Sequence, residues 1–143
     1  MTDLELDAAT VARLGDLCLT LPGVVEENAW HGVRWRVRGR TFAHVLTLVD
    51  GRPASYAEAA GIDGPAVVLT FRVTEEDREL LLRLGHPHFA ARWGRDLGGL
   101  ILAGAGSSPD GVDWSEVAEL LTDSWRLMAP QKLVSQLSAG GAG

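Results

Sequence analysis

Four arginines occupy alternate positions between His31 and Val45, a stretch that contains no acidic residue. Side chains alternate between the two faces of a β-strand, so this spacing predicts a cationic row on one face. Guanidinium groups bind phosphate through paired hydrogen bonds and stack on bases, so such a row could bind DNA. The alternative is an ordinary solvated sheet face, neutralised by Glu26 and Glu27 on a neighbouring strand. The candidate nucleic-acid-binding residues here are Arg34, Arg36, Arg38 and Arg40.

A β-hairpin must position this row. Gly39 and Arg40 fit a two-residue type II′ turn, which takes glycine first, between strands near 33–38 and 41–49. In that register Trp35 lies opposite His44, on an apolar and aromatic side of the hairpin. We therefore expect Trp35 to be buried, with Arg34, Arg36 and Arg38 exposed in a row on the other side.

A second candidate region is the sequence HPHFAARWGRD, which we expect to be a loop and which adds Arg92 and Arg95 to the possible phosphate contacts. His86 and His88 offer two nitrogens without a third ligand at a usual zinc spacing, so we predict no metal site. Trp93 could stack on a base or fill the core. If this loop and the hairpin line one pocket, it would suit a small anionic ligand. The pocket candidates are Trp35, His44, His88 and Trp93.

Catalytic patterns are not recognisable. Cys18 falls on the apolar stripe of the first predicted helix, where a thiol is inert. The sequence AGAGSSP lacks the Gly-Lys-Ser/Thr ending of a phosphate-binding loop, and no serine stands in a nucleophile elbow. The carboxylates are scattered. We therefore predict a non-enzymatic protein that uses no cofactor.

The order of elements indicates the fold class. A first helix capped by Asp7 is followed by strands, a Gly-, Pro- and Ala-rich connection over 50–66 with a mobile tip, and another strand. Thr74 and Asp113 are the expected N-caps of two later helices. We expect the last of these to bury a stripe that includes Trp125, and a short helix to follow Pro130. This order predicts an α+β fold, an antiparallel sheet packed against N- and C-terminal helices.

Composition sets the remaining limits. With 143 residues, 46% hydrophobic and 22% charged, the chain has the make-up of one globular domain over 1–139, followed by a flexible tail over 140–143. Residues 31–45 carry +4 within a net charge of −6, so the remaining 128 residues carry −10. An acidic body repels polyanions at long range. The apolar runs are too short to span a membrane, the start lacks a secretory pattern, and there is one cysteine. We expect a cytoplasmic monomer.

Several segments together resemble the MmcQ/YjbR family over about residues 14–133. They are LPGVVEENAW, VRGRTFAHV, the aromatic loop before GLIL, and DWSEVAELLTDSWRLMAP. The resemblance implies a CyaY-like fold, similar to frataxins, and the DNA-binding function usually ascribed to that family. Members commonly carry basic residues in this hairpin, and WRVRGR keeps that character at Arg36, Arg38 and Arg40. The alternative function is a small-ligand-binding or regulatory domain with a pocket between the sheet and the 86–95 loop.

Overall fold

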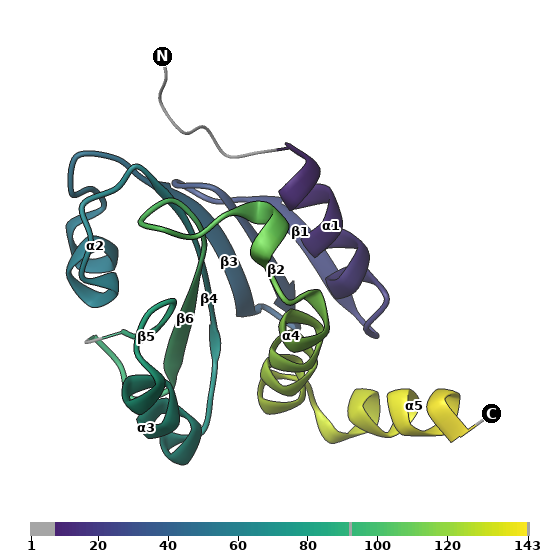
Figure 1. The fold of residues 1–143 in the computed structure, drawn as a ribbon. Helices are drawn as coiled ribbons and strands as arrows, with labels where there is room; N and C mark the ends of the chain where they lie inside the picture. Colours follow the sequence, from purple (N-terminus) through teal and green to yellow (C-terminus); the bar gives the residue numbers. More distant parts are fainter. Residues whose placement is uncertain (1–7, 92, 143) are drawn as a thin grey trace.

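The computed structural model describes residues 8–91 and 93–142 and contains a six-stranded antiparallel sheet with helices on both faces (Figure 1). The strand order is β1-β2-β3-β4-β6-β5. The strands are β1 (Val24–Asn28), β2 (Val33–Val37), β3 (Arg40–Leu48), β4 (Ala66–Arg72), β5 (His88–Ala90) and β6 (Leu97–Ala103). The helices are α1 (Ala8–Leu19), α2 (Ala54–Ala60), α3 (Glu75–Leu84), α4 (Trp114–Met128) and α5 (Gln131–Ala142). The predicted α+β class is confirmed, while the likeness to the CyaY-like architecture stays a prediction.

The first face of the sheet carries the larger core. Helices α1 and α4 cover it, and Trp35 and Trp125 are fully buried beneath them. The α4 helix begins at the predicted cap, because the Asp113 carboxylate accepts from the backbone N–H groups of Ser115 and Glu116. The indole N–H of Trp125 donates to the carbonyl of Pro22 at 3.0 Å. This face therefore buries both large aromatic side chains that the sequence placed in the core.

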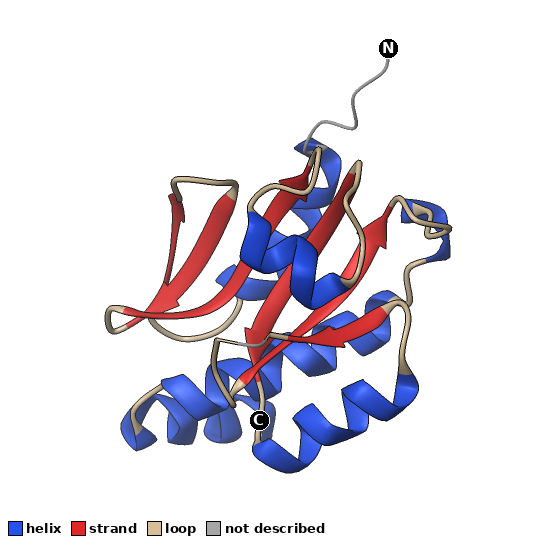
Figure 2. Ribbon diagram, turned by 90° about the vertical axis from the view of Figure 1, so that its left-hand side faces the viewer, coloured by secondary structure: helices blue, strands red, loops and turns tan. Residues whose placement is uncertain are grey.

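The second face is covered by α2, which Figure 2 shows lying across the front of the sheet. Leu46, Leu48 and Val68 pack beneath it. The sequence indicated only a connection with a mobile tip here, because its Gly, Pro and Ala content is typical of loops. The structure contains a helix of 7 residues in this connection. That helix begins after Pro53 and ends at Gly61, which adopts the left-handed conformation that glycine permits. The expected loop over 86–95 likewise contains a strand, β5.

The hairpin differs from its prediction by one residue. Its turn consists of Arg38 and Gly39, with φ values of 51° and 79°, which is the type I′ rather than the type II′ arrangement. A bulge in β3 then inserts Phe42, so Trp35 pairs with Ala43 and not with His44. A one-residue shift reverses the face of every partner. Trp35 is buried as expected, but His44 lies on the opposite face of the sheet.

The C-terminal helix is longer than the short one expected. α5 continues to Ala142, so its backbone is helical through residues 140–142, and the flexibility of that tail stays a prediction. Leu133 is buried against the core near the start of this helix. Among the helices of the described residues, none has both the length and the apolar character needed to cross a membrane.

Candidate functional site

Arg34 and Arg36 of β2 share one carboxylate on the neighbouring strand. Glu27 accepts from Arg34 Nε at 2.5 Å and from Arg36 Nη1 at 3.0 Å. These two hydrogen bonds, led by that of Arg36, hold the pKa of Glu27 below its usual value. Glu26 does not join them, because it lies on the other face and accepts from Trp35 Nε1 at 2.8 Å. Of the two acids expected to neutralise the row, only Glu27 does so.

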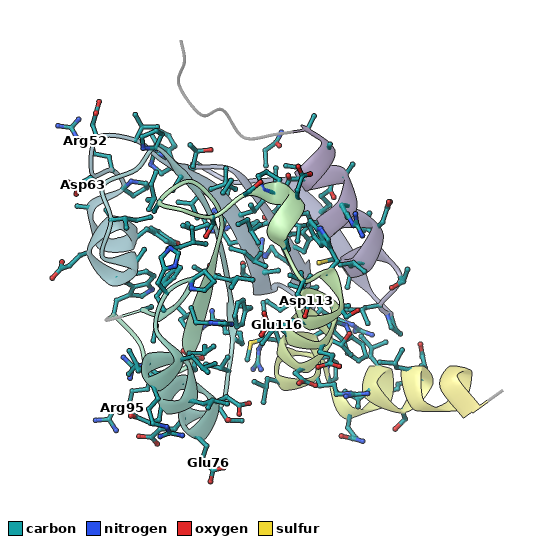
Figure 3. All side chains as sticks on the ribbon, viewed as in Figure 1. Arg52, Asp63, Glu76, Arg95, Asp113 and Glu116 are labelled. Atoms are coloured by element: carbon teal, nitrogen blue, oxygen red, sulfur yellow. The ribbon has the colours of Figure 1, made fainter. Side chains whose placement is uncertain are left out.

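The arginine row ends after Arg36. Arg38 belongs to the turn, so the predicted row of three is wrong, and its side chain and that of Arg40 are exposed at the hairpin tip. Arg95 extends into solvent beside α3 (Figure 3). Arg92 lies outside the described residues. The described arginines therefore lie in three places. Arg34 and Arg36 are paired with Glu27 on β2, Arg38 and Arg40 are at the hairpin tip, and Arg95 is in a separate loop.

A groove of about 390 Å³ opens beside α2 on the second face of the sheet. It lies between the β1–β2 turn, β3, β4, α2 and the loop that precedes β6. Of the residues that the structure describes, two arginines line it, Arg34 and Arg72, and no carboxylate does. The other side chains of chemical interest in its lining are Trp30, His31, His44, Tyr56, Thr70 and Trp93.

Aromatic rings form one wall of the groove. Tyr56 of α2 meets Trp93 edge-on, with ring centroids 4.8 Å apart, and meets His44 in the same way at 5.8 Å. Trp93 remains 44% exposed, so it does not fill the core. Trp30, at the rim, is 95% exposed. These rings give the groove a surface on which a planar group can stack.

His44 has a defined tautomer in this wall. Its Nε2 lies 2.5 Å from the carbonyl oxygen of His31, which can only accept, so Nε2 carries the proton. Its Nδ1 then accepts from the Tyr56 hydroxyl at 3.3 Å. Burial, with the nearby charge of Arg34 as a smaller cause, lowers the pKa of His44 below its ordinary value. The imidazole is therefore neutral at pH 7, and burial raises the pKa of Tyr56, which stays protonated.

Arg72 is fixed by three different contacts. Its Nε donates to the carbonyl of Thr41 at 3.2 Å, and its Nη1 donates to Asp96 at 3.0 Å. Its backbone N–H donates to the hydroxyl of Ser124 at 2.7 Å, and that hydroxyl donates in turn to the carbonyl of Phe42 at 2.5 Å. Ser124 thus joins β3 and β4 from α4, on the opposite side of the sheet, next to the last paired residues of the two strands.

Two of the four predicted pocket residues lie in this groove, namely His44 and Trp93. Trp35 does not, because it points into the core on the first face. His88 does not either, because its Nε2 lies 3.2 Å from the carboxylate of Glu116 in α4. Across residues 8–91 and 93–142, no three His, Cys, Asp or Glu side chains gather in an arrangement that could hold a metal ion.

Sequence reasoning missed several lining residues, among them Trp30, Tyr56 and Arg72. Each comes from a different segment, and only the folded chain brings these segments together. Arg72 gave one detectable signal, since it is the charged residue at the end of the apolar run AVVLTF. A charge in that position has to leave the core, and it does so at the groove.

Comparisons with known proteins agree with this fold. A crystal structure of a protein from Pseudomonas syringae superposes with a TM-score of 0.60 at 16% identity, covering 86% of this chain and 99% of that one. A search of curated proteins gives no match. The family model described as YjbR matches residues 19–127, which is most of the sequence and includes β1 to β6 and nearly all of α4. The chain belongs to the YjbR family.

Proposed function

We propose that this protein binds a small anionic ligand with a planar part in the groove between α2, the β1–β2 turn and the loop before β6. The single observation that carries the proposal is the composition of the described lining, which holds two arginines and an aromatic wall but no carboxylate. Binding sites of this size are mostly apolar or aromatic with a few polar groups that converge on the ligand. The chain as a whole is acidic, so the positive charge available to an anion is local to this lining.

Both arginines are oriented yet retain free donors. Arg34 uses Nε and Nη2 for Glu27, and Arg72 uses Nε and Nη1 for Thr41 and Asp96. Among the described residues, nothing bonds to Nη1 of Arg34 or to Nη2 of Arg72. A guanidinium group held by one partner loses less conformational freedom when it binds a second. The groove therefore offers two charge-assisted donor groups above a wall of rings.

DNA binding is the second candidate function, supported by the exposed side chains of Arg38 and Arg40 at the hairpin tip. It ranks below the groove because the tip is an exposed turn, whereas the groove combines its arginines with aromatic rings in one concave lining. With two free cations, we expect weak binding without sequence preference and a slope of log affinity against log salt of about −2. Fluorescence anisotropy of a labelled oligonucleotide at two salt concentrations, repeated with Arg38→Gln and Arg40→Gln together, measures this slope.

The groove is tested by isothermal titration with AMP, which joins a planar base to a phosphate, and with adenosine as the uncharged control. We expect AMP to bind and adenosine to bind at least about tenfold more weakly, since charge-assisted contacts contribute about 1.5–3 kcal/mol. Arg72→Gln should weaken AMP binding by a similar factor. Arg83→Gln removes an exposed arginine of α3 outside the groove lining and should leave it unchanged. Equal binding of AMP and adenosine, or equal effects of the two variants, would contradict the proposal.

A further inference from the structure

A second hollow, of about 430 Å³, lies between α3 and α4, which are drawn in teal and in green in Figure 1. Leucine side chains make up most of its apolar lining. Leu80 and Leu84 come from α3, and Leu120 and Leu127 come from α4. Residues four or seven apart lie on the same side of a helix, so each helix contributes one row of leucines to the hollow.

These leucines are exposed to an unusual degree. Leu80 is 44% exposed, Leu84 54% and Leu127 41%, although all three line one concave surface. Single exposed leucines are common and need no explanation. A contiguous apolar surface with a polar rim is typical of a protein-binding site. The geometry, two helices with facing leucine rows, is that of a groove that accepts a third helix.

The rim of this leucine groove is acidic. Four carboxylates line it, from Asp77, Glu116, Glu119 and Asp123, together with two guanidinium groups. The guanidinium groups are already paired, Arg126 with Asp123 and Arg72 with Asp96. Within the described part of the chain, the carboxylates of Asp77 and Glu119 take part in no ion pair. The groove therefore presents an apolar floor below uncompensated negative charge.

We propose that the leucine groove binds an amphipathic helix of a partner protein, with leucine-like residues on one face and lysines or arginines beside them. Charge complementarity argues against residues 1–7 as the occupant, because they contain three acids and no base. They would place like charges at the rim, which costs free energy and slows association. A second copy of this chain is the alternative occupant that the experiment below tests.

The probe is a fluorescein-labelled peptide of leucine and lysine, about 14 residues or four helical turns long, with leucines at positions spaced three and four apart. Anisotropy is measured against the full chain. We expect Leu84→Ala to weaken binding about tenfold, because a leucine side chain that becomes buried contributes 1.5–3 kcal/mol. Leu82→Ala is the matched control, since Leu82 is 49% exposed on the same helix but does not line the groove. It should leave the affinity unchanged.

Charge is tested with a second matched pair. Glu119→Gln removes a rim carboxylate and should weaken binding, whereas Glu76→Gln removes an exposed carboxylate of α3 that points away from the groove (Figure 3) and should not. Three results would overturn the proposal: equal binding of a leucine–glutamate peptide, equal effects of Leu84→Ala and Leu82→Ala, or equal effects of the two glutamine variants. Sedimentation that shows a dimer abolished by Leu84→Ala would also overturn it, by assigning the groove to a second copy.

Discussion

The two faces of the sheet bury side chains to very different extents. On the first face, α1 and α4 enclose a continuous core in which Trp35 and Trp125 are 0% exposed. On the second face, the buried cluster that includes Leu46, Leu48 and Val68 lies beneath α2, and Trp30 at the rim of the groove is 95% exposed. Tryptophan side chains thus stabilise the core on the first face, whereas a tryptophan on the second face is exposed to solvent. The first face holds the structure together, and the second leaves room for a ligand.

Helix length explains this difference. α4 has 15 residues and α2 has 7, so their axes span about 22 Å and about 10 Å at 1.5 Å per residue. The longest strand, β3, has 9 residues and spans about 30 Å. A helix as short as α2 cannot cover such a strand. The groove occupies the part of the second face that α2 leaves uncovered.

The largest expected effect is a difference in the free energy of unfolding between two tryptophan variants. Trp125→Ala should lower the free energy of unfolding by about 3–5 kcal/mol, the range for deleting a large buried aromatic. Trp30→Ala should change it by less than about 0.5 kcal/mol, as expected for a surface substitution. Urea denaturation of both variants checks this contrast. Similar losses in the two variants would mean that the faces do not differ as described.

A smaller effect is expected at Ser124, whose hydroxyl satisfies the Arg72 N–H and the Phe42 carbonyl. Ser124→Ala leaves both buried groups without a partner, which should cost about 1–3 kcal/mol. Thr122→Ala is the control, because that hydroxyl bonds only to the carbonyl of Ala118 within the same helix. Its loss should cost less than about 0.5 kcal/mol. Equal losses in urea denaturation would show that the bridge between β3 and β4 adds nothing.

The pH dependence of stability tests the second face. Burial lowers the pKa of His44 in the folded chain below the 6.5 of a free imidazole. As the pH falls below about 6.5, the unfolded chain takes up a proton that folded His44 rejects, so stability decreases. His44→Asn should flatten this part of the profile, measured as the free energy of unfolding between pH 7.5 and 5. If the variant loses stability with falling pH as steeply as the wild-type protein, a group other than His44 causes that loss.

The smallest effect concerns the hairpin turn, which belongs to neither face. Arg38 has a φ of 51°, a conformation that costs most residues free energy and that asparagine tolerates well. Arg38→Asn creates the Asn-Gly pair preferred in type I′ turns. It should stabilise the protein by about 0.5–1 kcal/mol and leave AMP binding unchanged. Thermal unfolding measures the first effect, and a lower melting temperature would contradict it.

Sequence alone predicted the elements with strong local signals. The caps at Thr74 and Asp113 were confirmed, and so was the burial of Trp125, because caps and helical periodicity are local properties. The register of the hairpin was wrong, since nothing in the sequence marks Arg38 as left-handed. That one-residue shift placed Trp35 and His44 on opposite faces.

The groove was predicted only in part. His44 and Trp93 were expected to share a pocket and do so, because both lie in segments recognised as aromatic and basic. Tyr56 was missed together with its helix, whose Ala-rich sequence has no cap signal from a side chain. Arg72 enters the lining through strand pairing over a long separation, and Trp30 through the turn between β1 and β2. Pairing of that kind is decided by tertiary packing, which local patterns do not encode.

The hydroxyl of Ser124 connects the two faces of the sheet through two hydrogen bonds. It belongs to α4, which also forms a wall of the leucine groove, yet it holds two residues that line the ligand groove on the other side. One serine hydroxyl is therefore a direct hydrogen-bonded connection between a helix that lines the leucine groove and two residues of the groove on the other face. If both proposed occupants bind and Ser124 couples their sites, linkage requires the effect of each on the other's affinity to be the same.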